Sequence, residues 1–113
     1  MKLVDTSITL GELRTMAETR FGDLVKAVVD VRRGVMAVDA DLHADEEAFL
    51  LEGGSSQSDL WGVNLYPDLP HPDWVEFDSM INIRPSQGNR SRGVDDVEVQ
   101  ERIIAIVDRL VKR

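Results

Sequence analysis

The chain has 113 residues, of which 42% are hydrophobic and 30% charged, and this composition is typical of one folded globular domain. It contains no cysteine, which excludes disulfides, thiolate metal sites and cysteine nucleophiles. No apolar stretch has the length of a signal peptide or of a membrane-spanning helix. We therefore expect a single cytoplasmic domain over residues 1–113 that makes no contact with a membrane.

The net charge of −8 is distributed unevenly along the chain. Residues 34–83 contain no lysine or arginine, and their acidic residues are Asp39, Asp41, Asp45, Glu46, Glu47, Glu52, Asp59, Asp68, Asp73, Glu76 and Asp78. Arg84, Arg90 and Arg92 then follow within a stretch that contains no acid. A chain this acidic is repelled by a phosphate backbone unless its cations gather on one face, so the charge disfavours nucleic acid as a partner.

A helix is predicted from Thr9 onward, because Thr9 and Glu12 have the spacing of a capping box. Apolar residues recur at helical spacing, and Gly22 then ends the helix in a left-handed conformation. Residues 24–31 and 35–39 follow as two strands. The connection between them is too short for a parallel crossover, so we expect an antiparallel hairpin.

Four further elements are expected beyond this hairpin. A helix over 44–52 has an acidic first turn, which suits the positive end of its dipole. Strands over 60–66 and 74–84 are separated by a proline-rich loop, and a last helix begins at Asp95, which has a capping-box partner in Glu98. The order α-β-β-α-β-β-α favours an α+β fold, with a four-stranded, mainly antiparallel sheet and helices packed on one face.

Strand alternation places a cluster of polar side chains on the sheet face that points away from the helices. Residues 74–84 alternate between apolar and polar, and residues 60–66 contribute to the same face if the two strands pair. The resulting candidate patch consists of Asn64, Tyr66, Asp78, Asn82 and Arg84. Lys26 and Asp30 extend it from the first strand. The patch suits a polar ligand or a divalent cation held by oxygen ligands, although a water-facing antiparallel sheet is polar by default.

The loop between residues 84 and 93 is a candidate anion-binding loop, because it leads from a strand into a helix. Its side chains that suit an anion are Arg84, Gln87, Asn89, Arg90 and Arg92. The loop lacks the spacing of a phosphate-binding or dinucleotide motif, and Asp95 and Asp96 place negative charge at the start of the helix. The alternative is a structured loop held by its own side-chain hydrogen bonds.

His43 and Glu47 are the candidates for a metal site. One helical turn separates them, so both side chains can face one metal ion. No second histidine completes a metal-binding motif, and acidic residues are common at a helix N-terminus for electrostatic reasons. We therefore expect no metal site and no cofactor.

Three stretches of the chain resemble a known family, and these are Leu42–Asp45, Asp59–Pro67 and Ile81–Ser91. The second and third of them have the sequences DLWGVNLYP and INIRPSQGNRS. The family consists of small bacterial and archaeal proteins described only as a domain of unknown function, and the resemblance covers nearly the whole chain. It implies a single-domain prokaryotic cytoplasmic protein, and it implies no activity, substrate or catalytic residue.

The sequence leaves the function unknown, and two hypotheses are carried forward. The first is a small binding or interaction module that self-associates, because an open sheet has two edges to cover and the last helix has a broad apolar stripe. The alternative is an enzyme acting on an anionic, phosphate-containing small molecule, with or without a metal. In that case Arg84, Arg90 and Arg92 hold the anion, and Asp78 or His43 acts as a base or metal ligand.

Overall fold

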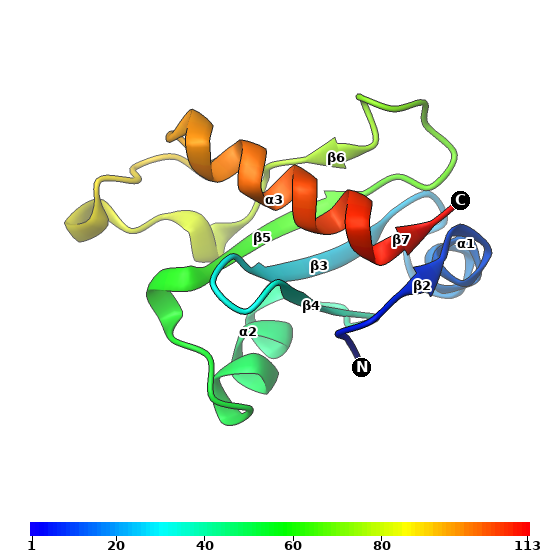
Figure 1. Ribbon diagram of the computed structural model, residues 1–113, viewed down its shortest axis with the longest axis horizontal. Coiled ribbons are helices and arrows are strands. Elements are labelled where there is room, and N and C mark those ends of the chain that lie inside the picture. Colours follow the sequence, from blue (N-terminus) through cyan, green and yellow to red (C-terminus); the bar gives the residue numbers. More distant parts are fainter.

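The computed structural model describes all residues from 1 to 113 and contains a five-stranded sheet in the order β1-β4-β3-β5-β6 (Figure 1). Its strands are β1 (Lys2–Val4), β3 (Val25–Asp30), β4 (Val35–Val38), β5 (Leu60–Leu65) and β6 (Val75–Glu76). All neighbouring strands in this sheet are antiparallel. The α+β class and the mainly antiparallel sheet are confirmed. The sheet has five strands rather than four, because β1 pairs with β4.

A second, two-stranded pairing joins the two ends of the chain. β2 (Ile8–Thr9) runs parallel to β7 (Val111–Lys112). The helices are α1 (Leu10–Arg20), α2 (His43–Glu52) and α3 (Val97–Leu110), and three 3-10 turns are η1 (Gln57–Asp59), η2 (Met80–Asn82) and η3 (Pro85–Gln87). None of the helices combines the length and apolarity that crossing a membrane requires.

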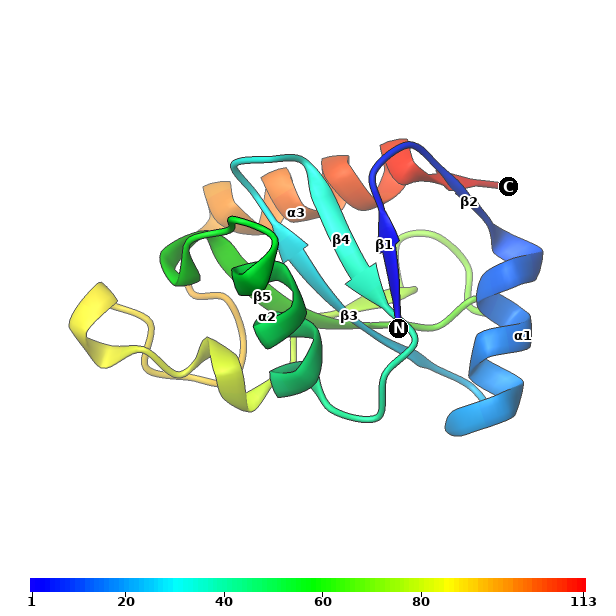
Figure 2. The same cartoon turned by 90° about the horizontal axis from the view of Figure 1, so that it is seen from below.

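Helices cover both faces of the sheet, which corrects the prediction that they pack on one face (Figures 1 and 2). α1 and α3 lie against the face formed by residues such as Ala27 and Val29 of β3. α2 lies against the other face, where Leu50 packs on Val28 and Leu60. The physical reason is that Val28, Leu60 and two residues of β4, Val35 and Ala37, form an apolar patch on this second face, which has to be buried. The face that α2 covers was expected to be open to water.

The predicted start of the first helix is confirmed. The backbone N–H of Glu12 donates to Thr9 Oγ1 at 3.1 Å, and the Glu12 carboxylate accepts from the Thr9 N–H at 3.3 Å, so both halves of the capping box form. The helix ends at Arg20, and Gly22 follows with a φ of 93°. Its left-handed conformation matches the predicted stop.

The last helix begins one residue later than predicted. Asp96 is the N-cap and accepts from the Glu98 N–H at 2.9 Å, whereas Asp95 bonds to the preceding loop. The apolar stripe of α3 is used inside the molecule, where Ile103, Val107 and Leu110 are fully buried in the main core. Val99 and Ile106 pack against this core, while Val97 at the start of α3 is 60% exposed.

The predicted strand over 74–84 is wrong beyond Glu76. The chain leaves the sheet there, and the segment around Ser79 crosses the face of β5 at Gly62, where a Cβ on the glycine would lie 2.5 Å from Ser79 Cβ. The side chain of Asn82 then makes the hydrogen bonds that a neighbouring strand would make. It accepts from the Gly62 N–H at 2.8 Å and donates to the Gly62 carbonyl at 2.9 Å. The alternation of apolar residues matched a strand, but the close approach at Gly62 turns this segment into a crossing one.

Candidate functional site

A cavity of about 400 Å³ lies between the start of α2, the strands β3 and β5, and the segment that crosses them. We call it the His43 pocket. Its apolar walls include Phe21, Leu24, Leu42, Met80 and Ile81. Its polar lining includes Lys26, His43, Asn64, Asp78 and Arg92. The pocket therefore combines an apolar rim with a small number of polar groups, as ligand sites commonly do.

The sheet register brings two of the polar residues together. Lys26 of β3 and Asn64 of β5 are direct cross-strand partners, so their side chains lie side by side on the α2 face. Asn64 in turn pairs with Glu76 of β6. Asp78 lies just after that strand, where the chain begins to cross the sheet. Strand parity thus accounts for the part of the site that the sheet supplies.

Asn64 presents an unpaired acceptor. Its Nδ2 donates to Glu76 Oε1 at 2.8 Å and to the Asp78 carbonyl at 3.4 Å, and because both partners only accept, the orientation of the amide is fixed. The side chain is buried, and its Oδ1 has no hydrogen-bond partner. Tyr66 donates to the same Glu76 oxygen at 3.0 Å and so holds that carboxylate in place. Oδ1 itself is closed to solvent, and a buried acceptor without a donor is costly.

His43 is a second acceptor in this pocket. Its Nε2 lies 2.8 Å from the Val63 carbonyl, and since a carbonyl only accepts, Nε2 carries the hydrogen. Burial lowers the pKa of His43, so the ring is neutral at neutral pH. A neutral ring with hydrogen on Nε2 leaves Nδ1 as an acceptor, and no group of the protein donates to it.

The N-terminus of α2 borders the pocket without a side-chain cap. Leu42 occupies the N-cap position, and its carbonyl accepts from the N–H groups of Asp45 and Glu46. The N–H groups of His43 and Ala44, which belong to two lining residues, have no such partner. Uncapped N–H groups and the helix dipole together favour negative charge at this point.

The charged side chains of the pocket are only partly paired with one another. Arg92 Nε donates to Asp78 Oδ1 at 2.6 Å. Lys26 forms no ion pair, and its ammonium lies 5.4 Å from the centre of the Phe21 ring. Two cations and one carboxylate therefore line this pocket in a protein whose net charge is −8.

The structure divides the predicted polar patch. Asn64 and Asp78 line the His43 pocket, and Tyr66 is linked to them through Glu76. Asn82 is instead buried beside β5, where it holds the Gly62 backbone. Arg84 is also turned inward, since the predicted strand ended too early to carry either residue on the expected face.

Arg84 holds the backbone. It donates to the carbonyls of Gln57 and Leu60, and its guanidinium lies 4.2 Å from the centre of the Trp61 ring. Planar, multiply donating arginine suits this combination of backbone bonds and stacking. Both Nη groups are thereby used within the chain, whereas Nε is buried without a partner.

The candidate anion-binding loop is held by its own side chains. Asn89 Nδ2 donates to the carbonyls of Asn82 at 2.7 Å and Gly93 at 2.9 Å, and Ser91 Oγ donates to Asp95 at 2.6 Å. The hydroxyl of Ser91 and the backbone N–H of Arg90 lower the pKa of Asp95. The bonds favour the alternative of a structured loop.

The five predicted side chains of this loop do not share a cavity. Gln87 and Arg90 are exposed, Asn89 and Arg84 are buried, and Arg92 reaches the His43 pocket. The metal candidates His43 and Glu47 gain no further ligand, because no group of three or more His, Asp and Glu side chains is placed to hold an ion. The role of His43 in the site is therefore that of a hydrogen-bonding group.

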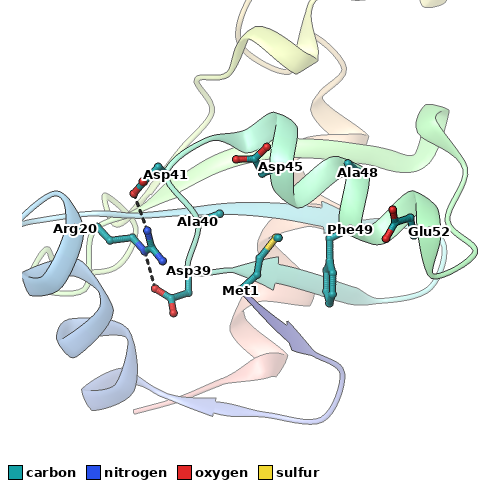
Figure 3. A pocket seen from close by; sticks show the side chains of 9 residues that line it. All are labelled: Met1, Arg20, Asp39, Ala40, Asp41, Asp45, Ala48, Phe49 and Glu52. Atoms are coloured by element: carbon teal, nitrogen blue, oxygen red, sulfur yellow. Dashed lines mark hydrogen bonds and ion pairs between the residues drawn. The ribbon is translucent and has the colours of Figure 1, made fainter.

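A second cavity, of about 450 Å³, lies on the other side of the loop between β4 and α2 (Figure 3). Figure 3 shows Arg20 between Asp39 and Asp41, to which it donates at 2.9 and 2.7 Å. Asp45 and Glu52 of α2 add further negative charge to the lining. The cation of this cavity is already paired, and no lining side chain is both buried and unpartnered. It fits a binding site less well than the His43 pocket.

Glu46 is a buried carboxyl near this loop that sequence analysis missed. The side chain is fully buried, its Oε2 accepts from the Ala40 N–H at 3.2 Å, and Oε1 has no partner. Burial raises the pKa of Glu46 to about 9, so the group is protonated at neutral pH. Its position as the fourth residue of α2 resembles that of an ordinary solvated acid, so the sequence pattern did not indicate its burial.

Glu46→Gln is expected to remove a pH dependence of stability. The carboxyl titrates near its ordinary value of 4.5 in the unfolded chain and at about 9 in the folded one, so the free energy of unfolding falls as the pH rises between these values. Urea midpoints near pH 5, 6.5 and 8 measure this effect. The stability of Glu46→Gln relative to the wild type should increase as the pH rises, and the exposed Glu52→Gln serves as control. An equal difference at all three pH values would contradict the prediction.

The chain belongs to the family described as Protein of unknown function (DUF5674), whose model matches residues 2–110. The resemblance to an uncharacterised family is confirmed to this extent. Comparison with curated proteins gave no match, and comparison with solved structures gave none either. Function therefore has to be inferred from the site itself.

Proposed function

We propose that this member of the DUF5674 family is a binding module that takes up a small amphipathic molecule in the His43 pocket. The observation that carries the proposal is the lining of this cavity, where Asn64 is buried with an unpartnered Oδ1 just below the surface. His43 Nδ1 adds a second acceptor, and neither is satisfied within the chain. A ligand that donates to His43 Nδ1, and to Asn64 Oδ1 after a small shift of the atoms that cover it, relieves the desolvation of these groups.

The size and walls of the pocket support a small ligand. Its volume of about 400 Å³ falls at the lower end of the range of about 300 to 1,000 Å³ that is typical of small-molecule sites. Phe21, Leu42 and Met80 are 41%, 55% and 65% exposed, so the rim presents apolar surface to water. A ligand with an apolar part is stabilised by covering it.

His43 favours the alternative of an enzyme that uses the same pocket. Its ring is neutral and its tautomer is fixed by the Val63 carbonyl, which leaves Nδ1 free to accept a proton from a bound substrate. Arg84 and Arg90 play no part in this version, since neither lines the pocket. Recovery of the ligand unchanged after long incubation favours the binding module, and its consumption favours the enzyme.

The sequence-based expectations of self-association, a cytoplasmic location and a prokaryotic origin form part of the same proposal. β1 is one of the two edge strands of the sheet, so one row of its backbone groups is available to pair with a second copy. This edge supports self-association better than the stripe of α3, which lies in the core.

Two matched variants of α2 test the proposed site. Ala44 lines the His43 pocket, and Ala48, one turn later, lines the second cavity; both are exposed. Ala44→Phe fills the mouth of the His43 pocket, whereas Ala48→Phe leaves it open. Because a ligand that binds the folded state raises its melting temperature, a panel of small amines, carboxylic acids and amino acids can be screened by thermal shift.

We expect at least one class of compound to raise the melting temperature of the wild type and of Ala48→Phe, and not that of Ala44→Phe. At a ligand concentration about 100 times Kd the stabilisation is about 2.7 kcal/mol. Circular dichroism checks that both variants fold. An equal shift in Ala44→Phe, or a loss of the shift in Ala48→Phe alone, would place the ligand elsewhere.

A further inference from the structure

One part of the His43 pocket attracts negative charge. The N–H groups of His43 and Ala44 are uncapped at the start of α2, and Lys26 has no carboxylate partner. Asp45, an acidic residue of the first turn, lines the second cavity instead. A carboxylate in the pocket can therefore accept from the helix N–H groups and lie close to the lysine ammonium.

Another part of the same pocket accepts hydrogen bonds and carries negative charge. Asn64 is 8% exposed and its Oδ1 is unpartnered, and His43 Nδ1 is an acceptor on a neutral ring. Asp78 adds a carboxylate that is paired on one oxygen with Arg92. An ammonium group, which has three donors and no acceptor, matches this set.

These two parts lie next to each other. Lys26 and Asn64 are direct partners across β3 and β5, and the Cβ atoms of such a pair are about 4.5 to 5.5 Å apart. A ligand that satisfies both parts therefore carries its anionic and cationic groups close together. In an α-amino acid the two groups are bonded to one carbon. We infer, resting on the proposed function, that the pocket binds a zwitterionic α-amino acid with an apolar side chain.

The apolar side chain follows from the rim of the pocket. Phe21, Leu42 and Met80 are exposed there, and the flexible thioether of methionine adapts to apolar groups of different shape. A volume of about 400 Å³ leaves room for a phenyl ring beside the amino-acid head group. A simple inorganic anion such as phosphate fits less well, because it brings fewer donors for Asn64 and is repelled by Asp78.

Calorimetric titration with L-phenylalanine and three truncated relatives tests the inference. The relatives are 2-phenylethylamine, which lacks the carboxylate, 3-phenylpropanoate, which lacks the amine, and glycine, which lacks the side chain. We expect L-phenylalanine to bind at least about tenfold more tightly than each of them, since each removes one matched group. Ala44→Phe should abolish the binding.

Lys26→Met separates the role of the lysine charge from that of its stem. This variant should weaken the binding of L-phenylalanine about tenfold, so that it no longer binds more tightly than 2-phenylethylamine. The exposed Lys112→Met should change neither affinity. If the amine or the acid alone binds as tightly as the amino acid and Ala44→Phe abolishes that binding, the zwitterion is wrong and the proposed site stands. If none of the four compounds binds, the zwitterion is also wrong, and the wider thermal-shift panel decides the proposed function. If Ala44→Phe binds L-phenylalanine unchanged, both proposals fall.

Discussion

Replacing Asn82 by alanine is expected to lower the free energy of unfolding by about 3 kcal/mol. The amide accepts from the Gly62 N–H and donates to the carbonyls of Gly62 and Arg92, and the residue is fully buried. Its loss leaves these backbone groups without partners in the interior, and each unsatisfied group costs about 1 to 3 kcal/mol. Urea denaturation of the variant and the wild type measures the difference.

Two further variants make the test specific to the hydrogen bonds of Asn82. Asn82→Asp keeps the acceptor for the Gly62 N–H and loses the donor, so we expect it to destabilise as well. Gln87→Ala changes an exposed residue five positions further along the chain and should change stability by no more than about 0.5 kcal/mol. A loss below about 1 kcal/mol for Asn82→Ala would show that the amide does not complete the sheet as described.

Replacing Gly62 by alanine is expected to destabilise the protein by about 3 kcal/mol, because the added Cβ has no room. It would lie 2.5 Å from both Cβ and Oγ of Ser79 and 3.2 Å from Ile81 Cγ1, so the crossing segment must move. That segment also forms one wall of the His43 pocket. The free energy of unfolding in urea measures the cost.

A control and a rescue variant accompany this substitution. Gly11→Ala in α1 meets no atom closer than 3.9 Å and should stabilise by about 0.5 to 1 kcal/mol through helix propensity. Ser79→Gly removes the clashing atoms, so in the Gly62→Ala background it should recover at least about 1 kcal/mol through coupling of the two sites. A Gly62→Ala protein as stable as the wild type would contradict the close approach.

Local patterns in the sequence predicted most of the elements. The capping box at Thr9 and the hairpin around Gly34 lie where expected, because each depends on residues close together in the chain. β1 was missed, since three residues carry too short a pattern to be recognised as a strand. The prediction for the segment after Glu76 was wrong for a tertiary reason, because alternating apolar residues also fit a chain that crosses a sheet at a glycine.

The site was predictable to the extent that strand parity determines it. Lys26, Asn64 and Asp78 were expected on one face, and the structure brings them together in one pocket. Asn82 and Arg84 were assigned by the same parity, which no longer applied once the strand had ended. The uncapped start of α2 was not expected, although the absence of a capping side chain at Leu42 could have indicated it.

The proposed ligand occupies one location, the His43 pocket, where the first turn of α2 meets the β3–β5 pair. Proton–nitrogen correlation spectra recorded during titration with each compound that raises the melting temperature test this location most directly. We predict that the largest changes fall on the backbone amide of Ala44 and the side-chain amide of Asn64. Changes concentrated instead around Arg20 and Glu52, or on the loop at Arg90, would contradict it.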